Sequence, residues 1–142
     1  MASLCRRGFT LIEVVVAMIV VALLATLVAP NVFRHVSSAR TTTARSQIEL
    51  LGSALDAFRI DIGRYPSATE GLEALWQRPA GVPDARWRGP YLRRRVPSDP
   101  WGRPYVFRSP GTVVTSAYDL LTFGADGVEG GEGEDADVTS WD

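Results

Sequence analysis

The chain has 142 residues, of which 46% are hydrophobic, and a formal net charge of -1 at pH 7. This length suits one small domain, and the near-neutral charge gives no case for electrostatic binding to nucleic acid. The single cysteine, Cys5, lies close to the N-terminus, so a disulfide framework within a folded domain is excluded.

The first element is an apolar run of 21 residues from Phe9 to Ala29, directly preceded by Arg6, Arg7 and Gly8. A membrane-spanning helix needs about 20 residues, so the run is long enough to span. We expect cleavage after Gly8, which unlike cleavage of an ordinary secretory signal leaves the apolar helix in the mature chain. The two arginines predict a cytoplasmic N-terminus with the remainder exported.

Glu13 is the one ionisable residue of this run. A carboxylate within hydrocarbon costs about 2.5 to 3.5 kcal/mol at the helix centre, and less near the end, so it usually has a partner or a function. After cleavage, Phe9 supplies an α-amino group that can neutralise Glu13 of a neighbouring subunit. The alternatives are a carboxylate that snorkels to the headgroups and, for the whole segment, a plain membrane anchor.

The segment Arg7-Gly-Phe-Thr-Leu-Ile-Glu13 and the apolar residues after it resemble the leader and N-terminal helix of type IV pilins and type II secretion pseudopilins. The resemblance implies that a prepilin peptidase cleaves after Gly8 and methylates Phe9, and that Glu13 guides subunit assembly. It divides the chain into a leader at 1–8, a transmembrane and assembly helix at 9–30, and a periplasmic domain at 31–142. The implied location is the bacterial inner membrane, with a single pass.

A second helical pattern follows Pro30, which is expected to kink the helix without ending it. Gly63 is expected to end it. The pattern predicts an amphipathic helix whose stripe packs on the chain's own sheet, with a parallel coiled coil as the alternative. The apolar residues that recur at spacings of three and four are Ala44, Ile48, Leu51, Leu55, Phe58 and Ile62.

The remainder predicts a small antiparallel sheet with long loops. A short helix is expected around Leu72, Leu75 and Trp76, with Ser67 or Thr69 as its cap. The Pro-, Gly- and Arg-rich segment 78–104 excludes helix, and strands are expected at 105–108, 112–116 and 118–123. The predicted fold class is therefore α+β, with a long N-terminal helix on this sheet.

Charge divides the C-terminal domain into two regions. The middle segment is basic, whereas eight carboxylates and no basic side chain follow residue 108. Interleaved aromatic residues permit nucleic-acid binding, but a solvated surface or a subunit interface is favoured for an exported domain. Opposite charge on two regions suits packing between subunits. The basic residues are Arg86, Arg88, Arg93, Arg94, Arg95, Arg103 and Arg108.

The segment 123–137 is rich in glycine and carboxylates, the composition of a calcium loop. Asp126, Asp135 and Asp137 are the predicted side-chain ligands. Their spacing differs from that of an EF-hand. By composition alone a disordered acidic tail fits equally well, although Trp141 favours docking of the chain end onto the domain.

Further motifs resemble the major pseudopilin family of the type II secretion system: Glu70-Gly-Leu-Glu-Ala-Leu75, Pro97-Ser-Asp-Pro-Trp-Gly-Arg-Pro-Tyr105 and Gly124-Ala-Asp-Gly127. The resemblance implies the type IV pilin-like fold. It also implies a calcium site made of the Asp126 side chain, one or both of Asp135 and Asp137, and the carbonyls of Phe123 and Val128.

The function implied is that of a structural subunit, not an enzyme, which polymerises into the periplasmic pseudopilus and supports export of folded proteins across the outer membrane. Implied partners are further copies of the chain, minor pseudopilins, the prepilin peptidase and the inner-membrane assembly platform. A type IV pilin, a minor pseudopilin and a membrane-tethered calcium-dependent binding domain are the alternatives.

Overall fold

The computed structural model describes residues 9–115 and 117–141, and it describes no side chains for residues 27–37. The predicted leader at 1–8, Gly8 included, lies outside the described residues. The chain divides into two compact units, residues 1–36 and 37–142.

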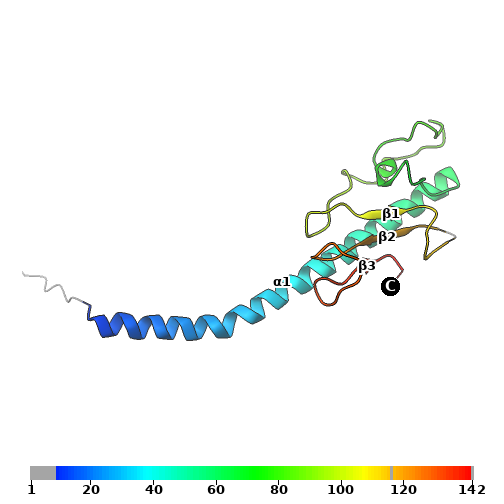
Figure 1. Cartoon of the computed structure of the whole chain (residues 1–142). Coiled ribbons are helices and arrows are strands. Elements are labelled where there is room, and N and C mark those ends of the chain that lie inside the picture. Colours follow the sequence, from blue (N-terminus) through cyan, green and yellow to red (C-terminus); the bar gives the residue numbers. More distant parts are fainter. Residues whose placement is uncertain (1–8, 116, 142) are drawn as a thin grey trace, which may run out of the picture. The chain divides into compact units, whose positions relative to one another are not determined.

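Helix α1, Leu11–Ile62, is the longest element (Figure 1). It begins after Thr10, whose carbonyl and hydroxyl oxygens accept the Glu13 N–H at 3.1 and 3.3 Å. A threonine at this position caps the helix by satisfying one of its free N–H groups. The helix continues through Pro30, and it ends before Gly63, whose φ of 89° breaks the helical path. The continuation past Pro30 and the end before Gly63 confirm the predictions, whereas the kink expected at Pro30 stays a prediction.

The first unit is a helix with an unburied apolar surface. Every described side chain from Phe9 to Thr26 is exposed. Exposed fractions reach 83% at Leu11 and 68% at Met18. Over the part of the chain that the structure describes, no helix is both long and apolar enough to cross a membrane.

The second unit has its core between the C-terminal half of α1 and the small sheet. The predicted apolar stripe of α1 is buried here, and Leu55 and Phe58 are fully inaccessible. This stripe packs with residues of the sheet, Leu120 and Val138 among them. The helix therefore packs on the chain's own sheet, as predicted. The stripe residues in the core are Ala44, Ile48, Leu51, Leu55 and Phe58, and Ile62 packs at its edge.

The sheet has three antiparallel strands in the order β1-β2-β3, namely β1 at Val106–Arg108, β2 at Asp119–Thr122 and β3 at Val138–Thr139 (Figure 1). Leu120 lies opposite Phe107 of β1, and Thr122 opposite Val138 of β3. The central strand β2 is buried along its whole length. The α+β fold class is confirmed, and two of the three predicted strands are present.

The predicted strand at 112–116 is wrong. Its N–H groups at Thr112, Val113 and Val114 donate to the carboxylate of Asp119, at 2.6 to 3.3 Å, and so cannot join a ladder. Burial alone raises the pKa of the Asp119 carboxyl, but these bonds and one from the Thr112 hydroxyl outweigh burial and bring the pKa well below its usual range.

The short helix is present as the 3-10 helix η1 at Leu72–Leu75, but its capping differs from the prediction. Gly71 stands at the cap position, and no side chain caps this helix. Ser67 instead exchanges hydrogen bonds with Glu70, one of which joins the Ser67 N–H to the Glu70 carboxylate at 2.7 Å. Arg64 binds the same carboxylate at 2.6 and 2.8 Å, and this hydrogen bonding lowers the pKa of Glu70 to about 2.

Candidate functional site

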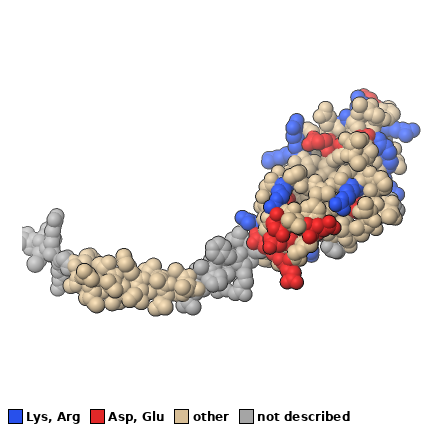
Figure 2. Space-filling view, viewed as in Figure 1, with Lys and Arg blue, Asp and Glu red and all other residues tan. Residues whose placement is uncertain are grey.

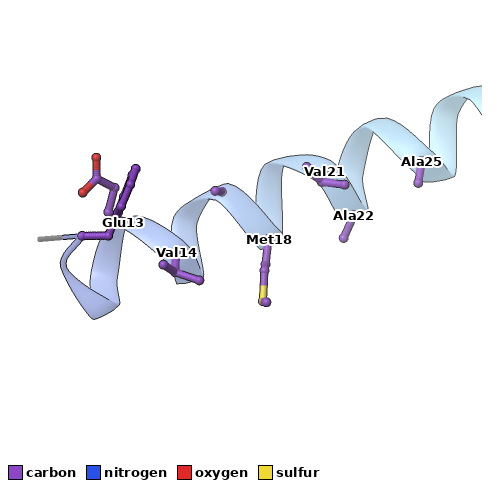
Figure 3. A pocket seen from close by; sticks show the side chains of 8 residues that line it. Glu13, Val14, Met18, Val21, Ala22 and Ala25 are labelled. Atoms are coloured by element: carbon purple, nitrogen blue, oxygen red, sulfur yellow. The ribbon is translucent and has the colours of Figure 1, made fainter.

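Glu13 lies in the first turn of α1, at the end of a shallow groove along the helix. Figure 3 shows its carboxylate projecting from the ribbon, with Val14 and Met18 farther along. The groove is almost entirely apolar, so a carboxylate at its end is the one group there that can attract a cation. Its lining residues are Phe9, Glu13, Val14, Ala17, Met18, Val21, Ala22 and Ala25.

The C-terminal loop, residues 123–137, is held by its own backbone. The N–H of Ala125 donates to the carbonyl of Glu134 at 2.9 Å, and the N–H of Gly127 to that of Phe123 at 3.1 Å. Asp126 accepts the N–H of Val128 at 3.0 Å. The loop is therefore a closed structure, and the disordered-tail alternative does not describe it.

Two oxygen atoms of this loop, one from Asp137 and one from Asp135, are candidate ligands for a cation. Asp137 Oδ2 accepts the N–H of Gly130 at 3.0 Å, whereas its Oδ1 is buried without a hydrogen bond among the described residues. The Asp135 carbonyl points inward, because a Cβ added to Gly124 or Gly131 would lie 2.6 or 2.7 Å from its oxygen. A buried, unpaired carboxylate oxygen and a peptide carbonyl are the kinds of ligand that a hard cation such as calcium takes.

The three predicted aspartates are placed differently from one another. The Asp137 side chain is partly buried, whereas those of Asp126 and Asp135 are exposed. Among the described side chains, no three from His, Cys, Asp or Glu form a group that could hold a metal ion. Any cation site at this loop would therefore need peptide carbonyls in addition to carboxylates.

Three side chains outside the loop also hold it, and none of them belonged to the calcium site predicted from the sequence. Arg103 binds the carbonyls of Gly124 and Ala125, and Trp101 and Arg40 both bind the carboxylate of Glu134. Trp101 and Arg103 belong to the sequence motif Pro100-Trp-Gly-Arg103. Spacing alone does not show that its side chains reach residues more than 20 positions away.

The basic segment borders a second groove, which lies within the second unit. Leu50, Leu51 and Leu92 supply apolar lining, and Arg93, Arg94 and Arg95 lie beside them. All three arginines are exposed. Where the structure gives ion pairs, none involves these three.

Acidic side chains gather elsewhere on this unit. In Figure 2 they form a patch where Figure 1 places the C-terminal loop. Glu129 and Glu132 are exposed members of this loop. One unit thus carries a basic, partly apolar groove and a separate acidic surface. Such a pair of unlike surfaces suits a head-to-tail contact between copies.

Comparison with known proteins gives one consistent result. The family model of type II secretion system (T2SS) protein G matches residues 31–141, and that of the prokaryotic N-terminal methylation motif matches residues 4–29. The type II secretion system core protein G of Pseudomonas aeruginosa is 42% identical over 138 residues, which are 96% of either chain. The protein of the same name from Vibrio cholerae is 41% identical and covers 96% of this chain and 92% of its own.

A solved structure agrees with these matches. The major pseudopilin from the type 2 secretion system of enterohaemorrhagic Escherichia coli superposes with a TM-score of 0.63 at 34% identity. The match covers 79% of this chain and 95% of the other.

Proposed function

The chain belongs to the type II secretion system protein G family, and we propose that it is a structural subunit of the periplasmic pseudopilus, through which it supports export of folded proteins across the outer membrane. The observation that carries the proposal is the apolar surface from Phe9 to Thr26, at which every described side chain is exposed, with Glu13 in the first turn of α1. Burial of such a surface against further copies is strongly favourable. No catalytic step is required of the subunit.

Filament imaging tests this proposal directly. Cells that overproduce the full chain together with the secretion system are expected to show filaments that contain it. A chain that stays monomeric in the membrane under these conditions would instead support a membrane-tethered binding domain.

Processing and membrane insertion belong to the same proposal. The match to the methylation motif supports cleavage after Gly8 and methylation of Phe9 by a prepilin peptidase. We place the N-terminus in the cytoplasm and the second unit in the periplasm, with Phe9 to Ala29 in the inner membrane before assembly. This run includes three residues, 27–29, whose side chains the structure does not describe. Minor pseudopilins and the inner-membrane assembly platform are the remaining proposed partners.

Calcium is the proposed ligand of the C-terminal loop. Asp137 would supply a carboxylate oxygen and Asp126 a second one, with Asp135 and the carbonyls of Phe123 and Val128 as the other candidates. When bound, the ion supplies positive charge to a loop rich in carboxylates and ties its two ends together. The support is the buried unpaired Oδ1 of Asp137 and the inward carbonyl of Asp135.

We expect saturating calcium to raise the melting temperature of the full chain in detergent micelles. At a concentration 100 times the dissociation constant, linkage gives about 2.7 kcal/mol, which corresponds to about 10 °C for a domain of this size. Asp137→Asn is expected to lose most of this increment, because it weakens the ligand at the buried position. The matched variant Glu129→Gln, at an exposed residue outside the proposed ligand set, should keep it. Equal melting with calcium and with chelator would refute the calcium site.

Contacts between copies are proposed to use the basic groove. Reversal of charge in the triple variant Arg93→Glu, Arg94→Glu, Arg95→Glu is expected to lower the filament yield at least about tenfold, since like charges placed across an interface cost several kcal/mol. The measurement is the amount of filament per cell at equal subunit level. A double variant, Arg86→Glu with Arg88→Glu, changes exposed arginines that do not line the groove and should assemble normally. Wild-type yield from the triple variant would exclude the groove as an interface.

A further inference from the structure

The turn at residues 99–103 is fixed to the central strand of the sheet. The carboxylate of Asp99 is buried and accepts the N–H groups of Trp101 at 3.0 Å and of Arg103 at 2.7 Å. It also accepts the hydroxyl of Thr122 on β2. The N–H of Asp99 donates in turn to the Arg103 carbonyl at 2.8 Å. The backbone of Arg103 therefore has a defined position relative to the sheet.

From this position the Arg103 guanidinium reaches the first residues of the C-terminal loop. Its Nη1 donates to the carbonyl of Gly124 at 2.7 Å, and its Nη2 to that of Ala125 at 2.6 Å. Because the two hydrogen bonds come from one rigid, charged group, they fix both the distance and the orientation of the two carbonyls relative to the guanidinium. They also neutralise part of the negative potential at these two carbonyl oxygens.

The loop is shaped to admit this guanidinium. Gly127 has a φ of 75°, and a Cβ added to it would lie 2.8 Å from both Cζ and Nε of Arg103. Only glycine allows this approach without displacement of the arginine. The absence of a side chain at Gly127 therefore leaves room for the Arg103 guanidinium, a cation that the chain itself supplies.

The same turn also reaches the far end of the loop. Trp101 donates its Nε1–H to Glu134 at 3.3 Å, and Arg40 of α1 pairs with the same carboxylate oxygen at 3.1 Å. Trp101 and Arg103, two positions apart in one turn, thus contact loop residues that are ten positions apart, Glu134 and Gly124. The turn therefore contacts the loop near both of its ends.

We propose that Arg103 is a built-in cation that holds the C-terminal loop closed in the metal-free subunit. Its two hydrogen bonds commit the carbonyls of Gly124 and Ala125 to the guanidinium. They leave the carboxylate of Asp137 and the carbonyl of Asp135 for a divalent cation. This second step rests on the calcium site proposed above, whereas closure of the metal-free loop does not. Arg103 therefore acts as a positioning residue for the loop.

Limited proteolysis of the full chain in detergent micelles tests the proposal. A protease that cuts after glutamate has three sites in the loop, at Glu129, Glu132 and Glu134. Cleavage in the native state follows the population of the open loop. In chelator, Arg103→Gln is expected to be cut at these sites at least about tenfold faster than the wild type, because two charge-assisted hydrogen bonds are lost. Cleavage at the wild-type rate would overturn the proposal.

Controls separate loop opening from general destabilisation. Arg86→Gln removes the same charge from an exposed position outside the basic groove and should be cut like the wild type. Cleavage by Arg103→Gln should rise at the loop sites and not after Glu49 within α1, and its melting curve should stay cooperative. If Arg103→Gln fails to fold, Arg103→Lys replaces it, because lysine keeps the charge but cannot present the planar fork. Unchanged protection in Arg103→Lys would then also overturn the proposal.

Calcium titration by calorimetry distinguishes this inference from the calcium proposal. If both hold, Arg103→Gln binds calcium at least about tenfold more weakly, because binding must then also order the loop. If the wild type binds no calcium but Arg103→Gln is still cut faster in chelator, the calcium site fails and the role of Arg103 stands. Equal calcium affinity together with equal cleavage in chelator refutes Arg103 and leaves the calcium site intact.

Discussion

Glu13→Ala is expected to abolish filament formation and secretion while the subunit stays folded and inserted. The carboxylate lies in the first turn of a helix whose described neighbours are exposed and almost entirely apolar. Removal of a charge makes insertion into hydrocarbon easier, by up to about 3 kcal/mol, so a failure of insertion is not the expected result. Under the proposed assembly, the variant loses the carboxylate that would pair with the α-amino group of Phe9 on a neighbouring subunit. Without it, the register between helices is no longer specified by charge.

Three measurements check this result. Membrane fractionation should show the Glu13→Ala subunit at the wild-type level, and its melting temperature should be unchanged. Filaments should be absent by imaging, and secretion of substrates should fall to background. The matched variant Glu49→Ala removes an exposed carboxylate from the second unit and should assemble normally.

Glu13→Gln separates charge from size. An uncharged side chain of nearly the same shape should also fail to form filaments if charge pairing specifies assembly. Normal filaments from either Glu13 variant would show that α1 assembles by apolar packing alone.

The helix and its packing face could be predicted from the sequence because the relevant pattern is local. The spacing of the apolar residues from Ala44 to Phe58 predicts that they share one face of the helix, and this face is buried. Gly63 ends the helix for a reason that is also local, its positive φ. Such features depend on residues within one or two turns of each other.

Hydrogen bonds between backbone groups and side chains from other parts of the chain could not be predicted in this way. Thr112, Val113 and Val114 have the β-branched character of a strand, but one carboxylate five to seven positions away binds all three N–H groups. Likewise, the composition of the C-terminal loop predicts an affinity for cations but not that the chain supplies one from Arg103. Both depend on tertiary positions that spacing does not encode.

The aspartates of the loop illustrate a third limit. Composition does not distinguish Asp126, Asp135 and Asp137 as calcium ligands, since each supplies the same carboxylate oxygens. Burial separates them, because only Asp137 has a buried oxygen without a hydrogen bond. Asp135 contributes an inward peptide carbonyl while its side chain is exposed. Its predicted role as a side-chain ligand therefore stays a prediction.

Asp119→Ala is expected to destabilise the second unit by about 3 kcal/mol, because it leaves several backbone N–H groups of the 112–114 loop without their acceptor. For a domain of this size that corresponds to a fall in melting temperature of about 10 °C. The measurement is thermal unfolding of the full chain in detergent micelles. Asp84→Ala is the matched control: the Asp84 side chain is 92% exposed, and its loss should change stability by no more than about 0.5 kcal/mol.

The pH dependence of this effect identifies its cause. The pKa of Asp119 is lower in the folded chain than in the unfolded chain, so its carboxylate stabilises the fold fully above the unfolded value of about 4. That contribution declines as the pH falls below about 4, and its loss is complete only below the folded pKa. The stability gap between wild type and Asp119→Asn should therefore be constant from about pH 5 upward and shrink toward pH 2. A gap that is the same at pH 2 and pH 7 would mean that packing, and not the charged acceptor, holds the loop.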